Sequence, residues 1–114
     1  MVDKPLLWLG SALDDLREFP ARVRRLAGYQ LGLVQHGLPP DDWKPLTTVG
    51  SGVLEIRIHT HQEHRVLYLA RFPEAVYVLH AFEKRQQRTS RDDLDIARKR
   101  LSELIARRGR REDH

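Results

Sequence analysis

The pattern of hydrophobic and polar residues changes to a period of two at residue 53. Within residues 53–59, apolar and polar side chains alternate, which is typical of a strand with one buried face. Two further apolar segments, 65–72 and 76–82, follow after short polar turns. We therefore predict three consecutive antiparallel strands. The positions of the first strand that are expected to face the core are Leu54, Ile56 and Ile58.

The first half of the chain has a different pattern. A short apolar segment at 5–9 predicts a strand, and two helical patterns follow it. Ser11 and Pro20 stand before them, and both residues are typical of helix starts. Gly37 and the prolines after it end the second helix, because proline cannot continue the hydrogen-bond ladder. We expect the polar residues 41–51 to be a connection without regular structure.

A last helix is predicted after Ser90, because Ser90 and Asp93 have the spacing of a helix cap. Apolar residues then recur at helical spacing from Leu94 to Ile105. We expect the basic residues 107–114 to fray outside a single domain of residues 1–106. The predicted order is β-α-α-β-β-β-α. The fold class is α+β, with the helices packed on one side of a mostly antiparallel, twisted sheet.

Composition restricts the possible functions. The 114 residues include no cysteine, which excludes disulfides and thiolate metal sites. No apolar run approaches the ~20 residues of a membrane helix, so we expect a cytoplasmic protein with no membrane partner. Residues 1–83 contain nine Lys and Arg against ten Asp and Glu, whereas residues 84–114 contain eleven against six. The net charge of +4 therefore comes from the C-terminal part, and it favours a polyanionic partner.

Several cations are expected on one face of the sheet. Alternation places Arg57 and His59 opposite the core positions, and Arg65 begins the neighbouring strand. Lys84 and Arg85 follow the end of the third strand. Clustered cations on a sheet repel one another unless an anion lies between them, and RNA phosphate would meet that need. The alternative is that the cations pair locally with carboxylates, namely Glu55, Glu63 or Glu83.

The histidines suggest acid–base chemistry more than metal binding. His59, His61 and His64 lie close in sequence, but no fourth ligand is evident and the segment is a polar turn, so we expect no metal site. His59 is the candidate for proton transfer, since imidazole titrates near neutral pH. Phe82, beside His80, is a candidate for stacking on a base, although a phenylalanine at the end of a strand is more often packed in the protein.

Seven short motifs together resemble the phage-derived branch of the RelE/HigB toxin superfamily. The resemblance extends over about residues 4–105. Its motifs are Lys4-Pro-Leu-Leu-Trp-Leu-Gly-Ser-Ala, Asp15-Leu-Arg-Glu-Phe-Pro, Gly28-Tyr-Gln-Leu, Lys44-Pro-Leu, Gly52-Val-Leu-Glu-Ile-Arg, Arg65-Val-Leu-Tyr and Val78-Leu-His-Ala-Phe-Glu-Lys-Arg.

The resemblance implies the toxin of a type II toxin–antitoxin system. Such proteins enter the ribosomal A site and cut mRNA there, by attack of the ribose 2′-hydroxyl on the adjacent phosphate. The reaction needs neither metal nor cofactor. The expected protein partner is a cognate helix-turn-helix antitoxin. The alternatives are a non-catalytic nucleic-acid-binding module and a phage-derived protein-interaction domain of the same fold.

The resemblance also implies roles for single residues. Arg57 matches a basic position on the first strand of the meander, and Arg65 matches the arginine that binds the scissile phosphate. Lys84 and Arg85 match a Phe-x-Lys-Lys motif. The catalytic set is therefore Arg57, Arg65, Lys84 and His59. The further RNA-binding candidates are Arg85, Arg88, Lys44, Phe82 and His80. Some relatives carry a Tyr or His proton donor near the end of the chain. Here no tyrosine follows Tyr77 and no histidine lies between His80 and His114, which leaves His59, His80 or Glu55 for that role.

Overall fold

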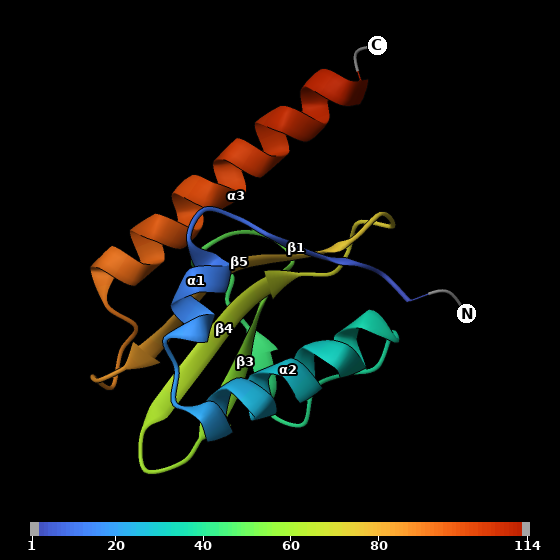
Figure 1. The fold of residues 1–114 in the computed structure, drawn as a ribbon. Helices are drawn as coiled ribbons and strands as arrows, with labels where there is room; N and C mark the ends of the chain where they lie inside the picture. Colours follow the sequence, from blue (N-terminus) through green and yellow to red (C-terminus); the bar gives the residue numbers. More distant parts are fainter. Residues whose placement is uncertain (1–2, 113–114) are drawn as a thin grey trace.

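The computed structural model describes residues 3–112, which form five strands and three helices. The strands are β1 (Leu6–Trp8), β2 (Trp43–Pro45), β3 (Val53–His59), β4 (Glu63–Leu69) and β5 (Val76–Lys84). The helices are α1 (Ala12–Arg17), α2 (Ala21–Gln35) and α3 (Arg91–Glu112). The observed class is α+β, as predicted (Figure 1).

All five strands belong to one sheet in the order β1-β5-β4-β3-β2. The three long strands β3, β4 and β5 form the predicted antiparallel meander. β1 adds to one edge parallel to β5, and β2 adds to the other edge antiparallel to β3. A register shift between Leu67 and Tyr68 interrupts the β4–β5 ladder, which is typical of a β-bulge.

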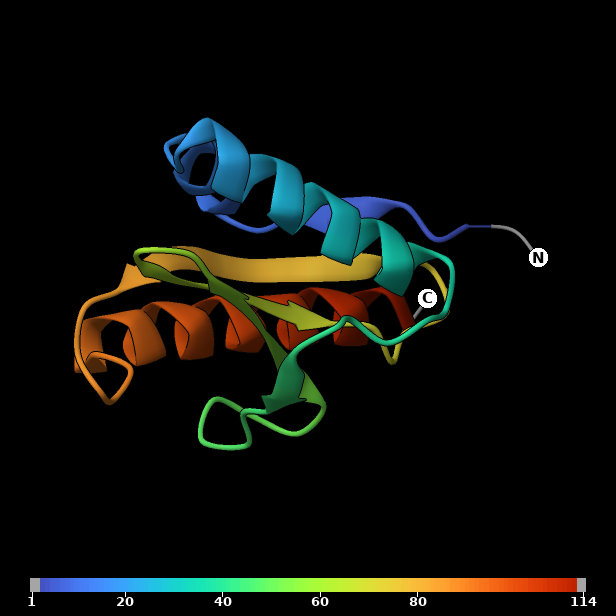
Figure 2. The same cartoon turned by 90° about the horizontal axis from the view of Figure 1, so that it is seen from below.

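Helices cover both faces of the sheet. Figure 2 shows α1 and α2 on one face and α3 on the other. The predicted arrangement with all helices on one side is therefore wrong. The physical reason is that the second face carries its own apolar side chains, including Val53, Leu67 and Leu79, which are fully or almost fully buried together with Ala97 and Leu104 of α3.

The α1–α2 face holds the other core cluster. Val23, Leu31, Ile56 and Val66 lie in it, and the predicted core positions Ile56 and Ile58 are buried there. Leu54 is partly buried against the same cluster. Each layer therefore contributes an apolar face to its neighbour, which is how a three-layer domain removes its hydrophobic surface from water.

β2 lies in the segment that we expected to have no regular structure. It pairs with Leu54–Ile56 of β3. Pro45 argues against a central strand because proline has no N–H to donate, but β2 is at the edge of the sheet, where proline is tolerated. The sequence prediction missed β2 for this reason.

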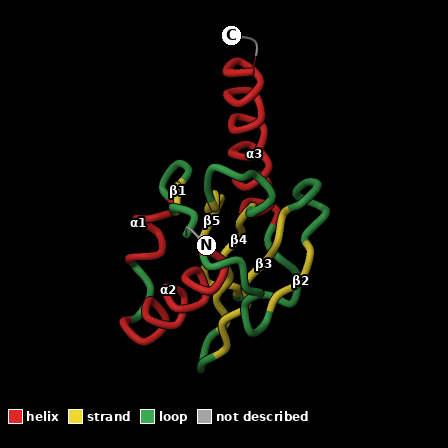
Figure 3. Tube along the Cα trace, turned by 90° about the vertical axis from the view of Figure 1, so that its right-hand side faces the viewer, coloured by secondary structure: helices red, strands yellow, loops and turns green. Residues whose placement is uncertain are grey.

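The start of α3 follows its prediction and its end does not. The Asp93 N–H donates to Ser90 Oγ at 3.1 Å, which is the expected N-terminal cap. The helix then continues to Glu112, through the segment that we expected to fray, and it extends past the sheet (Figure 3). Residues 113 and 114 lie outside the described residues.

Candidate nucleic-acid interface

The predicted site residues meet on the α3 side of the sheet, toward the β2 edge. Arg57 of β3 and Arg65 of β4, which the sequence places on neighbouring strands, are direct cross-strand neighbours. Further neighbours extend these positions into three rows. Each row contains one residue from β3, its neighbour on β4 and the next neighbour on β5. The three rows are Glu55, Leu67 and His80; Arg57, Arg65 and Phe82; and His59, Glu63 and Lys84. On the other side of β3, Lys44 of β2 lies opposite Glu55.

Glu55 is the central carboxylate of this surface. It is 1% exposed, although it is an acidic residue. Its Oε1 accepts a hydrogen bond from Arg57 Nε at 3.2 Å and lies 3.6 Å from Arg65 Nε. Glu55 therefore offsets the repulsion between two arginines that the register places side by side.

Arg65 is held from several sides. It is 5% exposed, and its Nη1 donates to Glu63 Oε1 and to the His64 carbonyl, each at 3.0 Å. Arg85 pairs with Glu83 at 2.8 Å, although its side chain is exposed. Local pairing with carboxylates, the alternative considered from the sequence, is thus what Arg57, Arg65 and Arg85 do in this structure.

Three other cations are without such partners. The side chains of Lys44, Lys84 and Arg88 make no hydrogen bond or ion pair to any residue in the range 3–112. Partial burial lowers the pKa of Lys84 from its usual value, and the nearby charges of Arg65, Lys44 and Arg57 lower it further, against the opposing effect of Glu55. An added anion would stabilise the charged form of Lys84, because an opposite charge nearby raises the pKa of a cation.

A cavity of about 280 Å³ opens beside these cations. Lys44 of β2, Lys84 at the end of β5 and Arg88 in the following loop contribute to its wall, and Glu55 does so as well. The arrangement combines concave shape with three unpaired cations. It is therefore suited to a small anionic group such as a phosphate.

His59 has both ring nitrogens engaged. Nδ1 lies 2.6 Å from Glu63 Oε1, and Nε2 lies 2.5 Å from Asp42 Oδ2. The hydrogen bond with Glu63, followed by that with Asp42, raises the pKa of His59 above 6.5. In this geometry His59 has no ring nitrogen free for a substrate, which argues against the predicted proton transfer by His59.

His80 and Phe82 are buried, in contrast to their predicted contact with RNA. They are 5% and 8% exposed, and their rings stack with centroids 4.9 Å apart. His80 Nε2 lies 2.7 Å from Asp93 Oδ1 in the first turn of α3. The physical reason is again that α3 covers this face of the sheet, which the sequence prediction placed in solvent.

The histidine cluster does not assemble in space. His64 lies on the opposite face of the sheet from His59, with its ring centroid 4.5 Å from that of Phe19. Burial lowers the pKa of His64. Among the described residues, no three His, Asp or Glu side chains come together as metal ligands.

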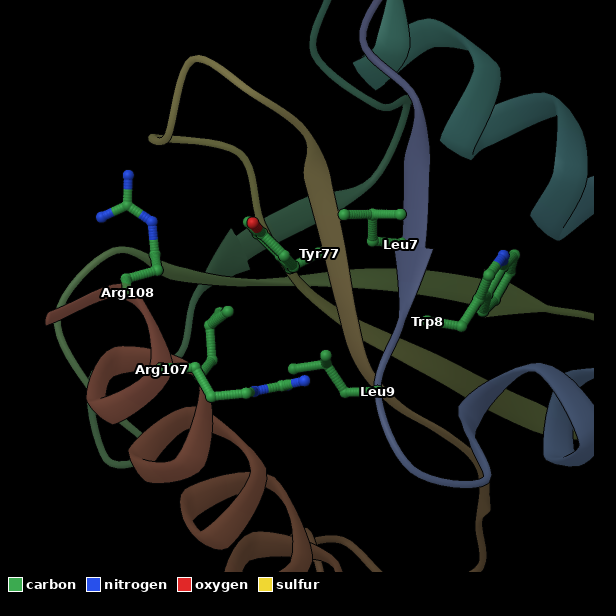
Figure 4. Close-up of a pocket in the computed structure, with 7 residues that line it drawn as sticks. Leu7, Trp8, Leu9, Tyr77, Arg107 and Arg108 are labelled. Atoms are coloured by element: carbon green, nitrogen blue, oxygen red, sulfur yellow. The ribbon is translucent and has the colours of Figure 1, made fainter. Parts of the chain in front are cut away.

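A second cavity, of about 230 Å³, lies between β1 and the C-terminal half of α3 (Figure 4). Leu7, Leu9 and Tyr77 face Arg107 and Arg108 across it. Arg108 is already bonded to Glu74, at 2.8 Å through Nε. None of the predicted site residues lines this cavity, so it is separate from the basic surface.

The sequence prediction missed two groups of residues at this site. Asp42, which binds His59, lies just before the unpredicted β2. Thr48, Gln87 and Thr89 line the 280 Å³ cavity from loops on either side. The alternation of Trp43, Lys44 and Pro45 is the only sequence signal for β2, and loop residues carry no periodic signal.

Comparison with known proteins identifies the family of this chain. Within residues 3–112, none of the helices combines the length and the hydrophobicity needed to cross a membrane. A search of curated protein sequences finds no match to the chain. The model of the family described as "Phage derived protein Gp49-like (DUF891)" matches residues 14–102. The chain therefore belongs to the Gp49-like phage-derived proteins, a family of RelE-like toxins.

Proposed function

We propose that this chain is the toxin of a type II toxin–antitoxin system, of the HigB-like branch, and cuts mRNA on the ribosome. The observation that carries the proposal is the set of unpaired cations, Lys44, Lys84 and Arg88, around a cavity that borders the network of Glu55 with two arginines. A surface of this kind suits an RNA backbone. The expected partners are mRNA, the ribosomal A site and a cognate helix-turn-helix antitoxin.

The proposed reaction is attack of a ribose 2′-hydroxyl on the adjacent phosphate. Lys84 and the partly exposed Arg57 would bind the phosphate oxygens, on which negative charge increases in the transition state. The buried Arg65, whose position is fixed by Glu55 and Glu63, would add positive charge from the protein interior. Lys84 would then donate a proton to the leaving 5′-oxygen, because its ammonium group offers three N–H donors and has no partner among the described residues. Water would accept the proton of the attacking hydroxyl.

The test is cleavage of mRNA on purified ribosomes, read by mapping the new RNA ends, together with growth arrest on induction. Wild-type protein should give discrete cuts. Lys84→Ala and Arg57→Ala should each slow cleavage by about 10²–10³-fold, the usual effect of removing one donor to a developing oxyanion. Lys99→Ala is the matched control, because Lys99 is an exposed cation on α3. Cleavage by both site variants at the wild-type rate would exclude the proposed roles.

A second function is favoured by one specific observation. Arg57 and Arg65 are already paired with carboxylates, which is compatible with a surface that binds RNA without cutting it. Such a protein would bind RNA with a steep dependence on salt, since binding to phosphates releases counterions. RNA that stays uncut on ribosomes, with salt-sensitive binding that Lys84→Ala weakens, would favour this function over the nuclease.

A further inference from the structure

We propose that the 280 Å³ cavity is a nucleobase site, which holds the base of one RNA nucleotide while Lys44, Lys84 and Arg88 bind its phosphate. The inference rests on the proposed function and extends it, because it assigns the part of the protein that reads sequence. Its evidence is the composition of the cavity wall and the lack of partners for the polar groups there.

The cavity has apolar walls as well as cations. Leu46, from the loop after β2, and Leu94, from the first turns of α3, both line it. Each is partly buried against the core cluster on the α3 face. Phosphate binding alone needs no apolar wall, whereas a base presents two apolar ring faces to a protein. The combination of Leu46 and Leu94 with cations therefore suits a whole nucleotide better than an isolated anion.

Uncharged polar side chains complete the cavity. Thr48, Gln87 and Thr89 line it, and their side chains make no hydrogen bond with any described residue. A carboxamide and a hydroxyl each offer both a donor and an acceptor. Bases are distinguished by the pattern of donors and acceptors along their edges, so these three side chains can discriminate between bases.

Both loops that carry these residues are anchored to α3. The Thr48 carbonyl accepts a hydrogen bond of 2.9 Å from Arg98 Nε, which holds the loop after β2 against the helix. Ser90 caps the helix directly after Thr89. The walls of the cavity are therefore positioned before a ligand arrives, which reduces the entropic cost of binding.

The test uses the four nucleoside 3′-monophosphates and inorganic phosphate as probes, with affinities from NMR titration of the full chain at low salt. One nucleotide should bind at least about fivefold more tightly than the other three, and more tightly than phosphate. Gln87→Ala and Thr89→Val should remove that preference while phosphate affinity stays within about twofold. Gln86→Ala is the matched control, since this neighbouring glutamine does not line the cavity. Lys84→Ala should weaken all five probes.

Two results would overturn the inference. The first is equal binding of all four nucleotides and phosphate, which would mean that only an anion is recognised. The second is that Gln87→Ala and Gln86→Ala behave alike. The outcome is separable from that of the proposed function. If the wild-type protein prefers one nucleotide but leaves mRNA uncut on ribosomes, the base site is supported and the nuclease function is contradicted. If the wild-type protein cuts mRNA but shows no base preference, only the base site is contradicted.

Discussion

Replacing Glu55 by glutamine should destabilise the protein strongly, although the change is nearly isosteric. Glu55 is almost fully buried and lies next to Arg57 and to Arg65, which is itself 5% exposed. Glutamine can still accept a hydrogen bond from Arg57 Nε, but it cannot offset the charge of the buried Arg65. Removal of one member of a buried ion pair costs ~3–5 kcal/mol. We expect the lower end, about 3 kcal/mol, because Glu63 still pairs with Arg65.

The measurement is urea unfolding followed by circular dichroism at pH 7. A loss of about 3 kcal/mol is a large part of the ~5–15 kcal/mol that stabilises a typical domain, so the midpoint should fall clearly. Glu83→Gln is the control, because Glu83 pairs with the exposed Arg85 and its loss should cost ~0–1 kcal/mol. If Glu55→Gln costs no more than Glu83→Gln, the central role given to Glu55 is wrong.

A double variant separates charge from packing. Glu55→Met together with Arg65→Met replaces an ion pair by apolar side chains, and such replacements are often neutral or stabilising. The double variant should therefore be more stable than Glu55→Met alone. If it is less stable, the cost of losing Glu55 comes from packing and not from an uncompensated arginine.

Three further predictions concern titration and salt. His59 should titrate above pH 6.5 in an NMR titration, and Glu63→Gln should lower its pKa, because the Glu63 hydrogen bond is the largest cause of the shift. The stability from this pair is complete between pH 4.5 and 6.5. It is lost as the pH rises through the raised pKa of His59 or falls through the lowered pKa of Glu63. Glu74, whose pKa the Arg108 hydrogen bond lowers to about 2, stabilises the fold above its ordinary pKa of 4.5. Glu74→Gln should thus lower the melting temperature at pH 7 but not near pH 2. RNA affinity should fall steeply between 50 and 200 mM salt, roughly in proportion to the phosphates bound, and Lys84→Ala should reduce the slope by about one.

The meander was predictable because its signals are local. Alternation over residues 53–59 and a short polar turn fix the register of a hairpin, since a shift by one residue would move every apolar side chain to the other face. The sequence also places Arg65 near Arg57 across the hairpin, and the structure shows the two as direct cross-strand neighbours. The cap at Ser90 is local as well, and it is also confirmed.

The position of α3 was not predictable by the same means. Alternation in β3 indicates one buried face, and the prediction treated the other face as open. The contrary signal lies in β4, where Val66 to Leu69 is continuously apolar, which is typical of a strand that is buried on both faces. Burial of Glu55, His80 and Phe82 depends on the placement of α3, so alternation in β3 alone could not predict it.

The sequence left open whether the cations of this site bind an added anion or pair with nearby carboxylates, and the structure shows that the answer differs from one cation to the next. Sequence places Arg57, Arg65 and Lys84 on one surface but does not say which of them meets a carboxylate. In the structure the two arginines are fixed by Glu55 and Glu63, whereas Lys84 has no partner among the described residues. A phosphate that displaced Glu55 from Arg65 would leave a buried carboxylate unpaired, which is costly. A phosphate beside Lys84 carries no such cost and restores the pKa of Lys84 toward its ordinary value. Substitution of Lys84 should therefore change ligand binding more than stability, and substitution of Arg65 should do the reverse.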